Sequence, residues 1–239
     1  MSEGKPLEGR TALVTGASKG IGAATAQALA AAGVHVVLTA RDVKGLEAVE
    51  DAIHDAGGTA TIAPVDLTET DGIARLASAL ASRWDTLDIM ILAAAYLPSL
   101  GPVAQIDGKE WSRAITVNLL ASQTLLASFD PLLKRATAGR VIGLTSSVAA
   151  KPRAYWGAYA ATKAGFENIL QSYGQEVGAI SPVRVAVIDP GATRTQMRAR
   201  AYPGEDPKSV KDPAVVADRL VSLLVEDFAN GYSERIDGR

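Results

Sequence analysis

Short runs of continuous apolar residues alternate along the chain with longer segments whose apolar residues recur at helical spacing. The short runs predict buried strands and the longer segments predict helices. Strands are expected at residues 11–14, 34–39, 60–65, 87–92, 140–145, 183–188 and 232–236. Helices are expected at residues 21–32, 43–56, 108–135 and 157–178, and two more begin at Thr68-x-x-Asp71, which resembles a capping box, and at Asp212-Pro213.

The order of these elements predicts the fold class. Strands that are apolar throughout are typical of a parallel sheet that helices cover on both faces. Right-handed crossovers then give an α/β fold with a doubly wound parallel sheet (a Rossmann fold), which binds ligands beyond the carboxyl ends of its strands. No linker, repeat or low-complexity segment divides the chain, so we expect a single domain over residues 1–239.

Composition narrows the class of function. Hydrophobic residues make up 48% of the chain and the net charge is −2, as expected for a soluble enzyme or binding domain. No basic stripe is visible, which argues against a nucleic-acid partner. The absence of cysteine excludes disulfides, thiolate metal sites and a cysteine nucleophile. His35, in a strand, and His54, on a helix surface, are too isolated to form a metal site.

Neither a signal peptide nor a membrane helix is expected. Residues 1–10 include Glu3 and Glu8 and lack an apolar core, unlike a signal peptide. The longest uncharged run, residues 89–106, is interrupted by two prolines and a glycine, unlike a membrane helix. We therefore expect a cytoplasmic protein with no membrane partner.

A glycine-rich loop, Thr15–Gly22, connects the first strand to the first helix. Glycines with the spacing G-x-x-x-G-x-G at such a junction let the backbone turn sharply and approach a ligand. Free amides at the start of the helix, with the helix dipole behind them, predict a phosphate site. The absence of a Lys-Ser/Thr pair after Gly22 excludes a P-loop, and no histidine follows where the G-x-S-x-G pattern of hydrolases would need one. From the loop alone, a glycine turn without a ligand remains the alternative.

Tyr159 and Lys163 stand four residues apart on a predicted helix, so they share one face. An ammonium group beside a phenol favours the phenolate and lowers a pKa that starts near 10. Such a tyrosine suits general acid–base catalysis near neutral pH. Ser146 and Ser147 end the preceding strand at the edge where ligands are expected, and a serine hydroxyl there would hold the oxygen that Tyr159 protonates.

With these motifs the chain resembles the short-chain dehydrogenase/reductase family over nearly its whole length. The matching features occur in the family's order: the glycine loop, Asp66-Leu67, Asn118, Ser147, Tyr159-x-x-x-Lys163, and Pro190-Gly191 with Thr195. The resemblance implies hydride transfer between a nicotinamide cofactor and a small-molecule carbonyl or alcohol. It also implies a homodimer or homotetramer formed through the two long central helices.

The resemblance assigns roles to four catalytic residues. Tyr159 would be the general acid in reduction and the base in oxidation, while Lys163 would lower its pKa and bind the nicotinamide ribose. Ser147 would hydrogen-bond the substrate oxygen, and Asn118 would anchor a water that links the lysine to solvent. The family's usual spacing of 13 residues before the tyrosine selects Ser146, whereas the position before Val-Ala selects Ser147, which we prefer. A strand cap for the serines and a backbone-satisfying amide for Asn118 are the structural alternatives.

Two basic residues favour NADP(H) as the cofactor. Arg41 follows the second strand, where NAD enzymes carry an acid for the ribose 2′-hydroxyl and where an arginine accommodates a 2′-phosphate. Lys19 adds a second positive charge nearby. The residues expected to bind the cofactor are Gly16, Ser18, Lys19, Gly20, Ile21, Gly22, Arg41, Asp66, Leu67, Ala93, Tyr159, Lys163, Pro190, Gly191, Thr193 and Thr195.

One segment departs from the family. Leu92-Ala93-Ala94-Ala95 replaces the family's Asn-Asn-Ala-Gly. The change removes an amide that ties neighbouring strands and adds a methyl group where the backbone approaches the cofactor, so weaker cofactor binding or lower stability would follow. A catalytically weak or inactive cofactor-binding protein with a regulatory or scaffold role is therefore the alternative to an enzyme.

Residues 192–211 form a loop-like, polar segment after a strand, and we expect a substrate lid there. Its arginines would either bind an anionic substrate or lie on the surface as solvated charges; they are Arg194, Arg198 and Arg200. An apolar substrate pocket is expected from Tyr96, Tyr155, Trp156 and Met197.

Overall fold

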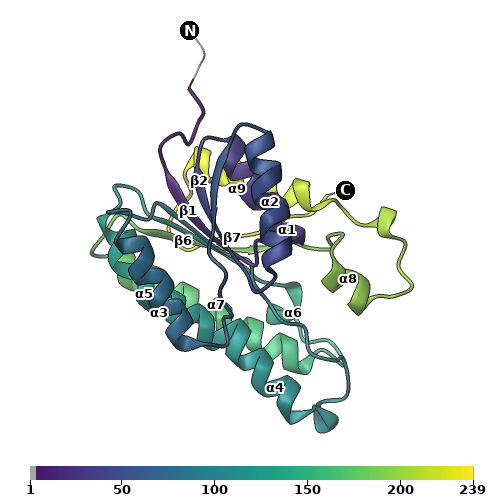
Figure 1. The fold of residues 1–239 in the computed structure, drawn as a ribbon. Coiled ribbons are helices and arrows are strands. Elements are labelled where there is room, and N and C mark those ends of the chain that lie inside the picture. The colour runs from purple at the N-terminus through teal and green to yellow at the C-terminus, as the bar shows by residue number, and fades with distance from the viewer. Residues whose placement is uncertain (1–3, 239) are drawn as a thin grey trace.

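Seven parallel strands form one sheet in the computed structural model, which describes residues 4–238. The strand order is β3-β2-β1-β4-β5-β6-β7, and helices cover both faces (Figure 1). The strands are β1 (Thr11–Thr15), β2 (His35–Thr39), β3 (Thr59–Ile62), β4 (Ile89–Leu92), β5 (Arg140–Leu144), β6 (Arg184–Asp189) and β7 (Tyr232–Arg235). The doubly wound parallel sheet predicted from the sequence is confirmed.

Successive residues of each strand enter two separate cores on opposite faces of the sheet. In β1, Val14 belongs to one core and Leu13 to the other. In β4, Ile91 lies on the first side and Met90 on the second. All four side chains are fully buried. The interior positions of β1, β4 and β6 are apolar because neither face of the sheet meets water there, whereas the edge strand β7 carries polar and charged residues.

Two layers of helices cover these cores. The first layer consists of α1 (Gly20–Ala31), α2 (Val43–Asp55) and α9 (Pro213–Glu226). The second consists of α3 (Thr70–Ala81), α5 (Ala121–Arg135) and α7 (Gly157–Gly178). Figure 1 shows the layers on opposite sides of the sheet. The remaining elements are α4 (Gly108–Ile115), α6 (Ser147–Ala150), α8 (Gln196–Ala201) and the short turns η1 (Val103–Gln105), η2 (Thr116–Leu120) and η3 (Pro207–Ser209). Within the described chain, no helix is both long and apolar enough to cross a bilayer.

The strand order changes direction between β1 and β4. From β1 the chain proceeds outward to β2 and β3, and it then returns to the other side of β1 with β4. The connections that follow β1 and β4 therefore diverge, and a crevice opens between them at the carboxyl ends of the strands. This crevice is where folds of this class bind ligands.

The long helix predicted over residues 108–135 is interrupted. α4 leads into the π-helical turn η2, and the α-helical pattern resumes in α5. The amide of Ala121 bonds to the carbonyl of Thr116, five residues back, as a π-helix requires. Such turns insert one extra residue and occur often at functional sites. The turn contains Asn118, which is buried.

The capping box expected at Thr68 is wrong. The Thr68 hydroxyl donates to Asp66 Oδ1 at 2.8 Å, and the Thr68 amide donates to the same oxygen at 2.9 Å. α3 begins only after Glu69, whose side chain forms no capping hydrogen bond. The Asp66 carboxylate, two residues upstream, closes a local turn by accepting both donors of Thr68. The Thr68 hydroxyl is therefore engaged in this turn and does not cap the helix.

Candidate active site

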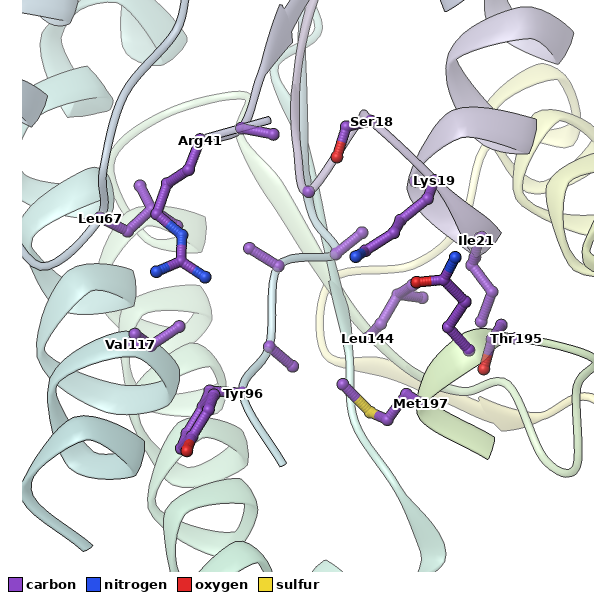
Figure 2. A pocket seen from close by; sticks show the side chains of 18 of the residues that line it. Ser18, Lys19, Ile21, Arg41, Leu67, Tyr96, Val117, Leu144, Thr195 and Met197 are labelled. Carbon is purple, nitrogen blue, oxygen red and sulfur yellow. The ribbon is translucent and has the colours of Figure 1, made fainter. Parts of the chain in front are cut away.

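A cavity of about 300 Å³ opens at the carboxyl ends of the strands. Segments that follow β1 to β6 supply its walls, so it occupies the crevice between the diverging connections (Figure 2). Most of the site residues predicted from the sequence line it. They are Gly16, Ser18, Lys19, Gly20, Ile21, Gly22, Arg41, Asp66, Leu67, Ala93, Tyr159, Lys163, Pro190 and Thr195. Asn118, Ser147, Gly191 and Thr193 lie outside its lining.

The glycine loop packs closely against the first turn of α1. A Cβ on Gly22 would come within 2.3 Å of the carbonyl oxygen of Gly16, whose own φ is 68°. The helix begins after Lys19, and no side chain among residues 4–238 caps its first turn. The first amides of a helix have no partner within the helix. Gly20 and Ile21, which line the cavity, therefore offer amide donors to an anion, and this cradle fits a phosphate group.

The hydroxyl of Thr15 holds the segment that follows β4. It donates to the carbonyl oxygen of Ile91 at 3.2 Å and accepts from the amides of Ala93 at 3.0 Å and Ala94 at 3.1 Å. Thr15 is buried, so water does not compete for these bonds. The alanine segment that departs from the family pattern is thus tied to β1 through its backbone, without an asparagine.

Asn118 joins three parts of the site. Its Oδ1 accepts from the amide of Tyr96 at 2.7 Å, and its Nδ2 donates to the Tyr96 carbonyl and to Thr162 Oγ1, both at 2.9 Å. Thr162 in turn donates to the carbonyl of Tyr159 at 2.9 Å. The Asn118 side chain therefore connects the π turn, the segment after β4 and the helix that carries Tyr159. Both of its amide hydrogens already have acceptors.

Tyr159 and Lys163 lie one turn apart on α7, with exposed fractions of 6% and 2%. The ammonium of Lys163 donates to the carbonyl oxygen of Leu144, at the end of β5, at 2.7 Å. The hydroxyl of Tyr159 lies 4.0 Å from the sulfur of Met197. Both polar groups therefore reach the cavity from a common helix face, as their spacing in the sequence predicts.

Burial dominates the proton affinities of this pair. It raises the pKa of Tyr159 above the usual value, and the charge of Asp189 raises it further. Burial lowers the pKa of Lys163 to about 8, although the charge of Glu167 opposes the shift. The lowered pKa expected for Tyr159 is not found in this structure, because burial and the charge of Asp189 both raise it. At neutral pH the phenol keeps its proton and the lysine is mostly protonated.

Ser146 and Ser147 follow β5 directly, and Ser147 is the first residue of α6. The side chain of Ser146, which precedes α6, forms no hydrogen bond that caps this helix. Neither serine lines the cavity, although Leu144 and Thr145 just before them do. The structure therefore places both serines immediately beyond the cavity wall.

Arg41 and Lys19 reach the cavity from different walls (Figure 2). Arg41 Nη1 lies 3.7 Å from Asp66 Oδ2, in an exposed ion pair of the kind that contributes little to stability. Burial favours the neutral form of Asp66, but hydrogen bonds from Thr68 and the charge of Arg41 outweigh it and lower the pKa. This corner of the cavity therefore presents both an arginine donor and a carboxylate acceptor.

Gly191 and Thr193 stabilise the turn after β6. Gly191 has φ 62°, and a Cβ there would meet the ammonium of Lys211 at 2.9 Å. Thr193 donates its hydroxyl to the carbonyl of Pro190 at 3.1 Å, and its backbone forms a bridge with Lys211. Gly191 and Thr193 thus do not line the cavity themselves, but they lie in the turn that positions Pro190 and Thr195 in its wall.

The lid expected over residues 192–211 contains a short helix, α8, which the sequence analysis missed. Thr195 caps it by accepting the amide of Arg198 at 3.1 Å. Met197 and Ala201, one turn apart on this helix, pack against the buried cluster of Leu97, Val148 and Tyr159. The lid therefore covers the tyrosine with an apolar face.

The four residues expected in the substrate pocket divide into two groups. Tyr96 and Met197 line the cavity, and Trp156 packs edge-on against Tyr159 with ring centroids 6.1 Å apart. Tyr155 does not belong to the pocket: it is 62% exposed and has φ 72°, which turns it outward at the start of α7.

Several residues of the cavity wall were not predicted as site residues. They are Ala40, Asp42, Val65, Ala94, Ala95, Val117, Leu144, Thr145 and Gln196. Most of them immediately follow or end a strand, so the rule that ligands bind at strand carboxyl ends could have found them. Val117 gave no such signal, because its position depends on the π turn.

Comparison with known proteins decides the family. The family model described as short chain dehydrogenase matches residues 10–206. The chain belongs to the short-chain dehydrogenase family. Members of this family are oxidoreductases that act on small molecules. This short-chain dehydrogenase is 34% identical over 224 residues to an uncharacterized oxidoreductase, YciK, of Escherichia coli K12, with 92% of this chain and 88% of that protein covered.

Solved structures of short-chain dehydrogenases superpose closely on this one. A short chain dehydrogenase from Shigella flexneri 2a strain 301, complexed with NADP, has a TM-score of 0.92 at 32% identity, covering 98% of this chain and 99% of that one. A short chain dehydrogenase from Escherichia coli CFT073, complexed with NADPH, also has a TM-score of 0.92, at 33% identity, covering 98% of each chain. The fold of the site is therefore that of enzymes crystallised with NADP or NADPH.

Proposed function

We propose that this short-chain dehydrogenase reduces a small carbonyl compound to an alcohol, or catalyses the reverse oxidation, with NADP(H) as the hydride carrier. The observation that carries the proposal is that Tyr159 and Lys163 line the same cavity as the glycine loop. A phosphate cradle and an acid–base pair therefore act on one bound complex. NADPH, when bound, would supply the hydride that adds to the carbonyl carbon.

Tyr159 is the group that gives the second hydrogen, as a proton, to the substrate oxygen. Its raised pKa keeps the phenol protonated at neutral pH, so the proton that reduction requires is present on Tyr159. Lys163 would bind ribose hydroxyls as an ammonium group. Its hydrogen bond to the Leu144 carbonyl supports this role, because it holds the ammonium at the cavity wall.

Ser147 would hydrogen-bond the substrate oxygen, with Ser146 as the alternative. Support comes from their position directly after Leu144 and Thr145, which line the cavity. Asn118 would support proton exchange at the lysine through a water. Because its amide hydrogens are engaged by Tyr96 and Thr162, that water would bind the main-chain carbonyl of Asn118.

NADP is proposed over NAD because two cations face the cavity and no acid takes the place of Arg41 after β2. The related structures complexed with NADP and NADPH support this choice. Arg41→Ser should reduce the preference for NADPH over NADH by at least about tenfold, since one charge-assisted hydrogen bond is worth roughly 1.5–3 kcal/mol. An unchanged preference would contradict the assignment.

The test of the activity is NADPH oxidation over a panel of aldehydes and ketones. Wild-type protein should oxidise NADPH with at least one of them, and Tyr159→Phe should lower kcat by about 10²–10⁴-fold with little change in the Kd for NADPH. Tight NADPH binding without turnover of any carbonyl, and no effect of Tyr159→Phe, would instead support a regulatory or scaffold protein.

A further inference from the structure

An apolar cluster surrounds Tyr159 on the side of α8. We define it by the residues that pack together there: Leu97, Leu100, Val148, Trp156, Met197 and Ala201. Leu97 is 3% exposed and Val148 is 4% exposed, so the floor of the cluster has no access to water. The sulfur of Met197 covers the tyrosine hydroxyl at 4.0 Å. A carbonyl oxygen that approaches this hydroxyl from the side of α8 would replace the Met197 sulfur and lie beside the cluster.

The lid helix α8 has an apolar face toward the cluster and a polar face away from it. Met197 and Ala201 face the cluster. Arg198 turns away and forms two hydrogen bonds with Glu205, of 2.6 Å and 2.5 Å. Its guanidinium also stacks on the ring of Tyr202 at 3.7 Å. The helix thus buries its thioether at the tyrosine and keeps the arginine's charge neutralised on the outside.

The other cations around the cluster are also engaged with protein groups. Arg153 donates to the hydroxyl of Tyr202, and its guanidinium lies 5.9 Å from the ring of Trp156. Arg194, before the helix, forms an ion pair with Asp212. None of these cations is directed at the tyrosine hydroxyl, so the lid arginines do not form an anion site there.

We propose that the substrate is an uncharged carbonyl compound that carries an apolar alkyl or aryl group beside the carbonyl. This inference rests on the proposed function, because it assumes that Tyr159 is the proton donor. The apolar group would take the place of the Met197 thioether between Leu97, Val148 and Trp156. A carboxylate or phosphate in that position would lose its hydration without gaining a partner. A methionine suits position 197, because its flexible side chain can leave the tyrosine hydroxyl without a change in the backbone.

Among the three lid arginines, Arg200 is the one that forms no ion pair with a described residue and could favour an anion. It is exposed, and no carboxylate of the described residues lies within ion-pair distance of it. Its charge acts on the rim of the cavity: the pKa of Glu110 is lowered chiefly by a hydrogen bond from Tyr96, and Arg200 adds to that shift. Since Glu110 already carries a compensating charge there, Arg200 is not expected to select the substrate.

The experiment compares two aldehydes of similar shape, methyl 4-formylbenzoate and 4-carboxybenzaldehyde. Both carry a planar carboxyl-derived para group, and only the second is charged at neutral pH; the change of the ester-to-acid ratio between variants cancels the difference in their intrinsic reactivity. The ester should be reduced by NADPH with a kcat/KM at least about tenfold higher than that of the acid, because a buried carboxylate lacks a partner. Equal or faster reduction of the acid would overturn the proposal while supporting the reductase activity.

Two variants test whether the apolar cluster causes the preference for the ester over the acid. Met197→Lys should shift the ester-to-acid ratio of kcat/KM toward the acid by about tenfold or more, because it places a cation beside the tyrosine. The matched control Arg200→Gln should leave the ratio unchanged. If Arg200→Gln instead reduces activity toward the acid alone, the arginine recognises an anion and the proposal is refuted.

Binding separates a failure of this inference from a failure of the proposed function. Equilibrium dialysis with the Tyr159→Phe protein and NADP should show tighter binding of the ester than of the acid, whether or not turnover occurs. Absence of turnover in the wild type, with the ester still preferred, would refute the reductase but retain the apolar site. Preference for the acid in dialysis would refute the apolar site itself.

Discussion

The side-chain amide of Asn118 and the backbone of Tyr96 form a closed pair of hydrogen bonds, 2.7 Å and 2.9 Å long. The pair fixes the segment after β4 at the point where it turns into the cavity wall. Asn118 can serve both this segment and Thr162 because the π turn brings the asparagine inward. A residue predicted as a catalytic group thus has a clear positioning role.

Asn118→Ala should therefore destabilise the protein. The change leaves the amide and carbonyl of Tyr96 and the hydroxyl of Thr162 without their partner in a buried region, which should cost about 2–4 kcal/mol of unfolding free energy. Urea unfolding measures the effect. Asn168→Ala, at an exposed position of α7, is the control and should change stability by less than about 0.5 kcal/mol. Equal losses in the two variants would contradict the positioning role.

Thr15→Val tests how the alanine segment after β4 is held. The valine keeps the shape of the side chain but removes the hydroxyl that bonds to Ile91, Ala93 and Ala94. We expect a loss of about 1–3 kcal/mol in stability and a higher Kd for NADPH, because unpaired buried amides remain at the cavity wall.

The matched control is Thr25→Val. Thr25 is also buried, but its hydroxyl has no hydrogen-bond partner among the described residues. Removing that hydroxyl should leave stability unchanged or raise it slightly, since no bond is lost and a buried polar group disappears. If both valine variants lose the same stability, the three bonds of Thr15 do not matter.

The elements that sequence reasoning predicted well are those whose pattern is local. The interior positions of the central strands β1, β4 and β6 are apolar because both faces of the sheet are buried there, and Gly22 is a glycine because a Cβ would collide with the loop. The spacing of Tyr159 and Lys163 survives in the structure because a regular helix preserves it.

The features that it missed leave no trace in the spacing of apolar residues. The π turn leaves the apolar periodicity of residues 108–135 intact, so the sequence pattern does not predict this turn. The sequence predicts Thr68 as a helix cap, but its hydroxyl donates to Asp66 instead. The pKa of Tyr159 is raised, whereas the sequence predicts that it is lowered. The spacing of four residues reveals the neighbouring lysine but not the burial of the phenol.

Gly22→Ala should weaken cofactor binding strongly. The new Cβ would lie 2.3 Å from the carbonyl oxygen of Gly16, so the glycine loop must move away from the first turn of α1. The Kd for NADPH, measured by fluorescence titration, should rise by at least about a hundredfold, because the phosphate cradle depends on that geometry. Gly204→Ala is the control, since a Cβ there meets no atom within 4 Å. Near-normal binding by Gly22→Ala would show that the loop does not hold the phosphate.

The titration of Lys163 should be visible in protein stability. Its pKa is about 8 in the folded protein and about 10.5 when the chain is unfolded, so between these values the unfolded chain binds more protons. Stability attributable to Lys163 therefore rises with pH across this window, by up to about 3 kcal/mol. Lys163→Met should lack that rise. Urea unfolding of both proteins from pH 7 to 10 measures the difference, and parallel curves would show that Lys163 titrates normally.

Glu167 should set the pH at which Lys163 loses its proton during turnover. Its Oε1 accepts the hydroxyl of Thr145 at 2.5 Å, which holds the carboxylate beside the end of β5, where Lys163 is bonded. Burial is the largest influence on the pKa of Lys163 and lowers it, and the charge of Glu167 works in the opposite direction.

Glu167→Gln removes that charge and keeps an acceptor for Thr145. The pKa of Lys163 should fall further, so the alkaline limb of the kcat/KM profile for NADPH-dependent reduction should move to lower pH while the rate at pH 6 changes little. Glu176→Gln, which removes an exposed carboxylate from the same helix, should leave the limb in place. A limb that stays fixed in Glu167→Gln, or moves equally in Glu176→Gln, would show that Lys163 is not held protonated by its neighbour one turn along the helix.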